Sequence, residues 1–265
     1  MELNKNKKYI EKFYNEDCDE DVRFDKKSTS VEFLTTMRYV QKFAKKGCKI
    51  LEVGAGTGRY SIALAKMGFD VTAVELVEKN LEVLKKNAKG LKNIKAYQGD
   101  ALKLDFADNS FDLVLNLGPL YHLFNKKDKM RAIKETIRVC KPGGICMLAY
   151  LTHSSVVWEY GVRKGEANKL INYFDKDFRI KDIPSEVFSC YYIDEFKKQF
   201  DKLNTSYLTN LTTDSLFGTM RDYIDDKILN KGFDTLLNWH FATCERLDHQ
   251  GLSSHMLYIC RKDKN

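Results

Sequence analysis

Apolar and polar residues alternate along the chain in two patterns between about residues 49 and 151. Short apolar runs, which indicate buried strands, occur at Lys49–Val53, Val71–Val74, Ile94–Tyr97, Phe111–Asn116 and Ile145–Leu151. Segments with apolar residues at helical spacing lie between them, at Arg59–Met67, Val77–Ala88 and Lys129–Cys140. Strands that alternate with helices predict βαβ units and a parallel sheet covered on both faces.

The residues before this region follow a different pattern. Helical spacing of apolar residues, including Tyr9 and Phe13, predicts helices within residues 1–46. The amphipathic run Val31–Phe43 follows Ser28-Thr29-Ser30, so we expect a Ser or Thr side chain to cap this helix. The acidic run Asp17–Asp21 predicts a loop between the helices.

The regular alternation stops after Leu151. One helix is predicted at Ile193–Phe200, and two further strands are predicted at Ser206–Leu211 and His255–Cys260. Residues 152–190 mix aromatic and charged side chains without a clear period, and residues 214–250 have a helical pattern. No repeat or low-complexity linker divides the chain.

These patterns predict one domain with additions. We expect residues 1–46 to form a helical segment that covers the functional site. Residues 47–265 would form the α/β domain, with insertions at about 152–190 and 214–250 that build a helical cap.

A glycine-rich turn follows the first predicted strand. Gly54, Gly56 and Gly58 occupy alternate positions just before the predicted helix at Arg59. Glycine permits the backbone torsions of a tight turn and lets a ligand approach closely, and the helix N-terminus offers unpaired N–H groups. The spacing differs from the G-x-G-x-x-G of dinucleotide sites, because the third glycine comes one residue too early.

Polar residues stand at or near the carboxyl ends of four predicted strands: Glu52, Glu75, Asp100 and Asn116. Ligands of open α/β sheets bind beyond these ends. A carboxylate at Glu75 could accept hydrogen bonds from both hydroxyls of a ribose. Asp100 could accept from the exocyclic amine of an adenine, and the small Ala101 leaves room for its ring. The sequence therefore predicts a nucleoside site at this edge.

These motifs together resemble those of the class I S-adenosylmethionine-dependent methyltransferases. The resemblance covers about residues 48–151 and rests on Glu52–Gly58, Glu75, Gly99–Ala101, Asp112–Asn116 and Arg138–Gly144. It implies a Rossmann-like, seven-stranded mixed sheet with helices on both faces, whose last strand, here His255–Cys260, runs antiparallel. It also implies S-adenosyl-L-methionine as the cofactor, with Leu117 and Asn116 near the methionine and the transferred methyl. The cofactor-binding residues expected from the resemblance and the motifs are Glu52, Gly54, Ala55, Gly56, Gly58, Arg59, Tyr60, Glu75, Leu76, Asp100, Ala101, Asn116 and Leu117.

The candidate catalytic residues follow the fourth strand. Gly118–Leu123 resembles a subgroup of bacterial small-molecule methyltransferases. His122 is the candidate general base, because an imidazole titrates near neutral pH; its alternative role is a hydrogen bond within the cap. Tyr121 could orient the acceptor or serve as a structural aromatic residue. Tyr14 and Arg23 are candidates to reach the cofactor carboxylate, with surface packing as the alternative.

Composition limits the other classes of protein. The 265 residues are 43% hydrophobic and 31% charged, as in a globular protein with a core. The start of the chain is polar and basic, and no apolar run could span a bilayer, so we expect a cytoplasmic protein without membrane partners. The seven cysteines form no C-x-x-C pair, which favours buried thiols over disulfides. His240 and Cys244 share a helix face but have no further ligands at suitable spacing, so no metal site is expected.

The most favoured function is methyl transfer from S-adenosyl-L-methionine to a small-molecule acceptor under the cap. Aromatic residues within 152–245 favour an apolar or aromatic acceptor. Two alternatives stay open. The net charge of +7 suggests an RNA or tRNA methyltransferase, although the lysines are spread along the chain. The chain could also be a cofactor-binding module without methyl transfer, whose cap binds a protein partner.

Overall fold

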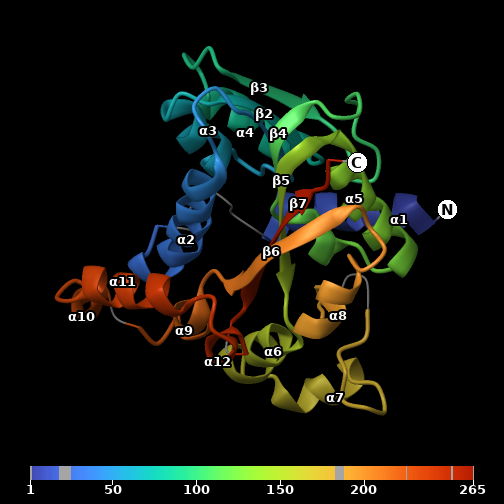
Figure 1. The fold of residues 1–265 in the computed structure, drawn as a ribbon. Coiled ribbons are helices and arrows are strands. Elements are labelled where there is room, and N and C mark those ends of the chain that lie inside the picture. The colour runs from blue at the N-terminus through green and yellow to red at the C-terminus, as the bar shows by residue number, and fades with distance from the viewer. Residues whose placement is uncertain (1, 18–24, 183–187, 225, 252, 265) are drawn as a thin grey trace.

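A seven-stranded mixed sheet forms the centre of the protein (Figure 1). The structure is a computed structural model, and it describes residues 2–17, 25–182, 188–224, 226–251 and 253–264. The strands are β1 Lys49–Val53, β2 Asp70–Glu75, β3 Ile94–Gln98, β4 Phe111–Asn116, β5 Cys140–Leu151, β6 Thr205–Thr212 and β7 His255–Lys262. Their order is β3-β2-β1-β4-β5-β7-β6. The strands β1 to β5 are parallel, and β7 runs antiparallel to both β5 and β6, which confirms the predicted sheet.

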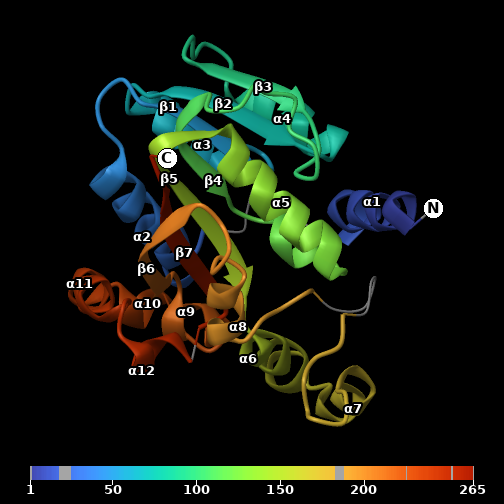
Figure 2. The same cartoon turned by 45° about the vertical axis from the view of Figure 1, so that its right-hand side comes forward.

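Helices cover both faces of the sheet, as predicted (Figure 2). The helices α2 (Lys27–Phe43) and α3 (Arg59–Lys66) pack with Ile50, Leu115 and Met147 on one face. The helices α5 (Lys126–Val139) and α8 (Ile193–Lys198) pack on the opposite face. Successive strand residues point to opposite faces, so each central strand is buried on both sides.

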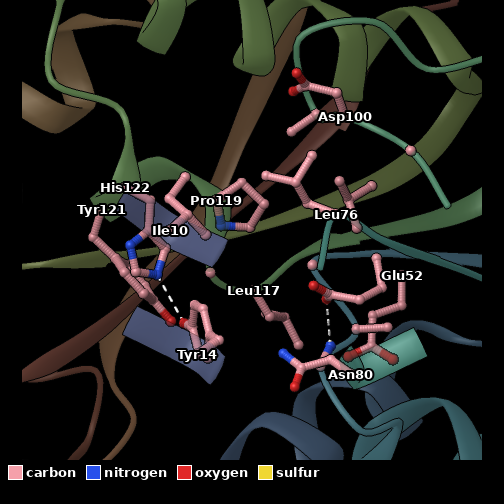
Figure 3. Close-up of a pocket in the computed structure, with 18 of the residues that line it drawn as sticks. Ile10, Tyr14, Glu52, Leu76, Asn80, Asp100, Leu117, Pro119, Tyr121 and His122 are labelled. Carbon is pink, nitrogen blue, oxygen red and sulfur yellow. Dashed lines mark hydrogen bonds between the residues drawn. The ribbon is translucent and has the colours of Figure 1, made fainter. Parts of the chain in front are cut away.

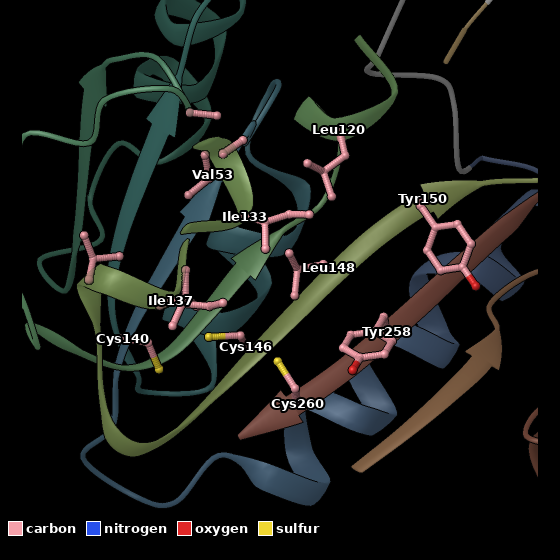
Figure 4. Packing of buried hydrophobic residues seen from close by; sticks show 14 of the residues in the cluster. Val53, Leu120, Ile133, Ile137, Cys140, Cys146, Leu148, Tyr150, Tyr258 and Cys260 are labelled. Atoms are coloured by element: carbon pink, nitrogen blue, oxygen red, sulfur yellow. The ribbon is translucent and has the colours of Figure 1, made fainter. Parts of the chain in front are cut away.

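The core on the α5 side contains large side chains from strands far apart in the sequence (Figure 4). Tyr150 of β5 stacks on Phe196 of α8 with ring centroids 3.9 Å apart, and Tyr258 of β7 stacks on Phe200 at 4.2 Å. These contacts join α8 to the antiparallel part of the sheet. Aromatic pairs of this kind add about 1 kcal/mol beyond the burial of their area.

Most of the segment between β3 and β4 is irregular. Arg138 of α5 organises it by donating from Nη2 to the carbonyl of Leu104 and from Nη1 to that of Phe106, both at 2.8 Å. Asp100, which follows β3, accepts from the backbone N–H of Leu102 at 2.9 Å. The chain beyond β3 is thereby fixed at the edge of the sheet.

The insertions start from the carboxyl edge of the parallel strands. β5 ends at Leu151, which pairs with His255 at the start of β7, and Thr212 at the end of β6 pairs with Met256. The first insertion contains α6 His153–Val156, a π-helix at Val157–Arg163, a short 3-10 turn at Ala167–Lys169 and α7 Leu170–Tyr173. The second contains α9 Ser215–Thr219, α10 Asp226–Leu229, α11 Phe233–Thr243 and α12 Leu247–Gln250. Both insertions gather at this end of the molecule (Figure 1).

The N-terminal region differs from the prediction at its cap. The chain begins with α1 (Glu2–Lys12) and a π-helical turn, Phe13–Asp17, and α2 begins at Lys27. No side chain caps α2, so the expected Ser or Thr cap is wrong. Thr29 and Ser30 lie inside the first turn and donate to the carbonyls of Lys26 (3.0 Å) and Lys27 (2.8 Å) instead. The expected acidic loop at Asp17–Asp21 lies largely outside the described residues.

Two further boundaries differ from expectation. α5 begins at Lys126, where Asn125 caps it by accepting from the N–H of Asp128 at 2.8 Å. β5 begins at Cys140, before the predicted start at Ile145, and includes Pro142-Gly143-Gly144 through a shift of register against β4. In the described part of the chain, no helix has both the length and the apolar character to cross a membrane.

Candidate active site

The glycine turn has the backbone that its sequence predicts. Gly54, Gly56 and Gly58 have φ of +78°, +54° and +93°, which side chains other than glycine rarely adopt. A Cβ on Gly54 would lie 2.7 Å from Cδ of Pro119, and one on Gly58 would lie 2.7 Å from Cγ of Leu84. Gly54 therefore allows the turn to pack against the segment after β4, and Gly58 allows contact with α4 (Glu78–Asn87).

Glu75, at the end of β2, holds this turn. Its Oε2 accepts from the N–H of Gly56 at 2.7 Å, and its Oε1 accepts from the N–H of Val77 at 2.8 Å. The side chain is buried, yet it lines the cavity beyond the strands. Each carboxylate oxygen can accept more than one hydrogen bond, so Glu75 can hold the turn and also bind a diol.

A cavity lies over the turn at the carboxyl edge of the sheet (Figure 3). Asp100, Leu76 and Pro119 lie along it, and Tyr14 and His122 close one side. The predicted residues that line it are Glu52, Gly54, Ala55, Gly56, Arg59, Tyr60, Glu75, Leu76, Asp100, Ala101, Leu117, Tyr121 and His122. The structure therefore brings together residues from four strand ends and the glycine turn.

Two predicted residues do not line this cavity. Gly58 faces α4, because a Cβ added to it would lie against Leu84. Asn116 is fully buried, and its Nδ2 donates to Oγ1 of Thr136 on α5 at 2.9 Å. Asn116 thus joins the end of β4 to α5, and its neighbour Leu117 is the residue that reaches the cavity.

Glu52 is a buried carboxyl group with a strongly raised pKa. Only 1% of the residue is exposed, and Ser61 of α3 donates a hydrogen bond to its Oε2. Burial raises the pKa of Glu52 to about 8; the charge of Glu75 adds to this rise, and the Ser61 hydrogen bond opposes it. Glu52 is therefore largely protonated at neutral pH in the protein alone.

His122 and Tyr14 form a hydrogen-bonded pair at the side of the cavity. Tyr14 Oη lies 2.8 Å from Nε2 of His122. The rings of Phe13 and Phe188 pack edge-on to this pair, with Phe188 5.2 Å from the imidazole centroid. This arrangement attaches the N-terminal region to the segment after β4, while Arg23, the other candidate in that region, lies outside the described residues.

Sequence reasoning missed several lining residues. Lys7, Ile10 and Glu32 come from α1 and α2, and Asn80 comes from α4. Helical spacing predicted only a packing role for the apolar residue among them, Ile10. Their place at the cavity depends on how α1 and α2 cross the sheet edge, which no local motif records.

A second cavity adjoins the first. Tyr14, Glu32 and Tyr121 line both cavities. The second cavity extends under the insertions, with aromatic and apolar walls and a set of charged groups. Its remaining lining residues are Phe13, Thr29, Leu151, Ser155, Val156, Glu159, Tyr160, Arg163, Phe188, Asp214, Gly218, Arg221, Ser254 and His255.

His240 and Cys244 have structural partners. His240 Nε2 lies 2.9 Å from Oγ1 of Thr35, and Cys244 Sγ lies 3.4 Å from the hydroxyl of Tyr39, so both join α11 and its end to α2. No group of three or more histidine, cysteine or acidic residues suited to a metal occurs among the described residues.

Burial lowers the pKa of His240 to about 4 from 6.5. The unfolded chain therefore binds more protons between these values, so this group's contribution to stability is lost as the pH falls from 6.5 to 4. We expect this loss to reach about 3 kcal/mol. Urea unfolding of His240→Gln, which keeps a hydrogen-bonding group for Thr35, should show a flatter acid limb than the wild type. An unchanged acid limb would contradict this assignment.

Comparisons with known proteins find a methyltransferase domain in the part of the chain that forms the parallel strands. A family model described as a methyltransferase domain matches residues 50–144. A demethylmenaquinone methyltransferase of Staphylococcus aureus is 43% identical over 104 residues, which are 38% of this chain and 42% of that protein. The chain thus matches less than half the length of these curated relatives.

Solved structures share the fold over most of the chain. A structure described as a SAM-dependent methyltransferase from Methanosarcina mazei is 16% identical, with a TM-score of 0.57 over 86% of this chain and 98% of that one. The [4+2]-cyclase SpnF is 18% identical, with a TM-score of 0.58 over 88% of this chain and 82% of that one. The protein is thus Rossmann-like in fold. Residues 50–144 match the methyltransferase-domain family, and the rest of the chain is similar to these structures in fold alone.

Proposed function

We propose that the protein transfers a methyl group from S-adenosyl-L-methionine to a small-molecule acceptor in the second cavity. The observation that carries this proposal is the junction of the two cavities, where Tyr14, Glu32 and Tyr121 line both. A ligand in one cavity would therefore lie next to a ligand in the other, because both would border these three side chains. Methyl transfer needs such contact, because donor and acceptor must be aligned at close range.

The first cavity suits the cofactor in its chemistry. Glu75 offers carboxylate oxygens to the ribose hydroxyls, and Asp100 offers them to an exocyclic amine. Leu76, Ala101 and Leu102 give apolar surface for the adenine ring. The glycine turn lets the methionine part approach the backbone, and the buried Glu52 can receive its ammonium group. When bound, the cofactor supplies the activated methyl group.

The second cavity suits an aromatic acceptor. The rings of Phe13, Tyr121, Tyr160 and Phe188 are in its wall, next to Leu151. Such a lining favours a flat, largely apolar molecule that a few polar groups orient. The matched relatives named demethylmenaquinone methyltransferases act, by their name, on a ring compound, which supports the same class of acceptor here.

We propose that the N-terminal segment and the insertions form one cap. Residues of 1–46 reach both cavities through Tyr14 and Glu32, and the insertions at about 152–190 and 214–250 contribute Tyr160 and Asp214 to the second. In this role His122 is a positioning residue, because its hydrogen bond holds Tyr14 at the junction. Tyr121, at the same junction, would orient the acceptor. A site enclosed in this way favours a small molecule over RNA.

Calorimetry with S-adenosyl-L-methionine and S-adenosyl-L-homocysteine tests the cofactor site first. We expect binding of both. A methyl-release assay with a panel of phenols, quinols, amines and carboxylic acids should then give turnover with an aromatic member. Binding without turnover on any acceptor, including tRNA, would favour a module without methyl transfer. Binding without methyl transfer is included among the outcomes because the [4+2]-cyclase SpnF has a similar fold. RNA retention that weakens steeply with salt would instead favour the nucleic-acid alternative.

A further inference from the structure

Asp214 and His255 form a buried pair at the second cavity. Asp214 follows β6, and His255 begins β7. Oδ1 of Asp214 accepts from Oγ of Ser253 (2.7 Å) and from the N–H groups of Ser254 (3.2 Å) and His255 (3.1 Å). Its Oδ2 lies 2.8 Å from Nδ1 of His255. Four hydrogen bonds therefore fix the carboxylate, and one of them fixes the imidazole.

The surroundings of Asp214 favour its ionised form. Burial opposes the charge of Asp214, but the hydrogen bond and charge of His255, with the Ser253 hydroxyl, hold the pKa of this carboxyl below its ordinary value. Asp214 is thus an ionised acceptor at neutral pH. Nδ1 of His255 carries a ring proton when it donates to Asp214. In the neutral form of that ring, Nε2 carries the basic lone pair.

The pair borders the cavity next to its junction with the cofactor cavity. Both residues line the second cavity, and the side chain of His255 is 21% exposed while that of Asp214 is 4% exposed. The His255 ring lies 6.4 Å from the ring of Tyr121, which lines both cavities. Glu32, also at the junction, places Oε2 3.7 Å from Nδ1 of His255. The imidazole is therefore beside the region where acceptor and cofactor would meet.

We propose that His255, oriented by Asp214, accepts the proton of a hydroxyl group on an aromatic acceptor. This rests on the methyl transfer proposed above. The hydroxyl oxygen forms a bond to the methyl carbon, the carbon–sulfur bond of the sulfonium breaks with its electron pair left on sulfur, and the hydroxyl proton moves to Nε2 of His255. A neutral hydroxyl is a weak nucleophile, so a positioned base accelerates this step.

The charges around His255 favour this role. The imidazolium that forms faces two carboxylates, Asp214 and Glu32, which stabilise its positive charge. The cavity's other charged groups satisfy one another: Arg163 and Arg221 both donate to Glu159, at 2.7 Å each to Oε2. Tyr121 and Tyr160 add ring surface for an aromatic acceptor. The pair therefore combines a base with a binding surface for a phenol-like molecule.

The geometry distinguishes His255 from His122. Nε2 of His122 lies within hydrogen-bond distance of the Tyr14 hydroxyl, and His122 lines the cofactor cavity but not the second cavity. His255 is held through Nδ1 and lines the second cavity. The acceptor's proton is thus assigned to His255, and His122 is assigned the positioning of Tyr14.

para-Nitrophenol tests the proposal without a known acceptor, because its phenolate absorbs visible light. We expect the wild type, saturated with S-adenosyl-L-homocysteine, to bind the probe and to ionise it at a pH about one unit or more below its value in water. His255→Gln and Asp214→Asn should bind the probe but lose this shift. His249→Gln, whose ring packs against Trp239 outside both cavities, is the matched control and should keep it.

Three outcomes would overturn the proposal. A wild type that binds no probe refutes the aromatic hydroxyl as the acceptor class. A shift that survives in His255→Gln but disappears in His122→Gln assigns the proton to His122. Cofactor binding and turnover with an unshifted probe leave the proposed methyl transfer intact and refute the Asp214–His255 pair as its base.

NMR of the histidine-labelled wild type keeps the test available if the variants fail to fold. We expect one histidine with Nδ1 protonated, whose Nε2 resonance moves when para-nitrophenol is added to the complex with S-adenosyl-L-homocysteine. Histidine resonances that all stay in place on saturation with the probe would contradict the proposal.

Discussion

Replacing Glu75 with alanine should weaken binding of S-adenosyl-L-methionine a hundredfold to a thousandfold, about 3–4 kcal/mol. The carboxylate accepts from the N–H groups of Gly56 and Val77 at 2.7 and 2.8 Å, and it faces the cavity that we assign to the cofactor. Alanine removes the acceptor for the ribose hydroxyls and also frees the glycine turn that the cofactor must contact. Both losses lower the affinity for the cofactor, so the expected effect exceeds that of one hydrogen bond.

Calorimetry of three variants measures this effect. Glu75→Gln keeps one acceptor oxygen and should lose less affinity than Glu75→Ala. Glu82→Ala, on the exposed face of α4, is the control and should bind as the wild type does. Circular dichroism confirms that each variant is folded. Unchanged affinity in a folded Glu75→Ala protein would refute the assignment of this cavity to the cofactor.

The parallel part of the sheet was predictable because each strand has a local signature. β1 and β4 are short apolar runs with a polar residue at or next to the last position, Glu52 and Asn116, and both are buried on the two faces of the sheet. Glycines at positive φ and the carboxylates at strand ends follow from backbone sterics and from the common direction of parallel strands. Periodicity and motif spacing therefore sufficed for this half of the molecule and for most residues that line the first cavity.

The Asp214–His255 pair that lines the second cavity could not be predicted in this way. Asp214 and His255 are far apart in the sequence, and the antiparallel register of β6 and β7, which pairs Thr212 with Met256, brings them together. Neither residue belongs to a motif. His122 stood out because it follows β4 directly, but the structure gives it Tyr14 as a partner. Proximity to a strand end thus identified the edge of the sheet, whereas the base that we propose depends on the pairing of β6 with β7.

Tertiary packing also explains why two of the predicted cofactor-binding residues, Gly58 and Asn116, do not line the first cavity. Gly58 is required by the turn itself, since a Cβ there would meet Leu84. Asn116 ends a strand like the other polar residues, yet its side chain points to Thr136 of α5 rather than outward. A position at the end of a strand specifies the edge of the sheet at which a residue lies. The alternation of side chains along the strand decides to which face of the sheet its side chain points.

Replacing Glu52 with glutamine should stabilise the protein at alkaline pH and remove most of a pH dependence that this residue creates. Burial raises the pKa of Glu52 to about 8, from 4.5. The folded protein therefore holds one more proton than the unfolded chain between these values, and its stability falls as the pH rises through this window. The fall should reach about 5 kcal/mol. Glutamine remains neutral and can keep the hydrogen bond with Ser61.

Urea unfolding at a series of pH values measures how the stability of Glu52→Gln and of the wild type changes with pH. Equal slopes of stability against pH above pH 4.5 would contradict the prediction.

The same proton links Glu52 to the proposed cofactor. An ammonium group bound beside Glu52 favours its ionised form, so binding below about pH 8 should release a proton. Calorimetry in buffers of different ionisation enthalpy detects this release, which Glu52→Gln should abolish. Below this pKa, part of the binding free energy is spent on ionising the buried carboxyl of Glu52. The affinity for the cofactor should therefore increase as the pH rises toward 8.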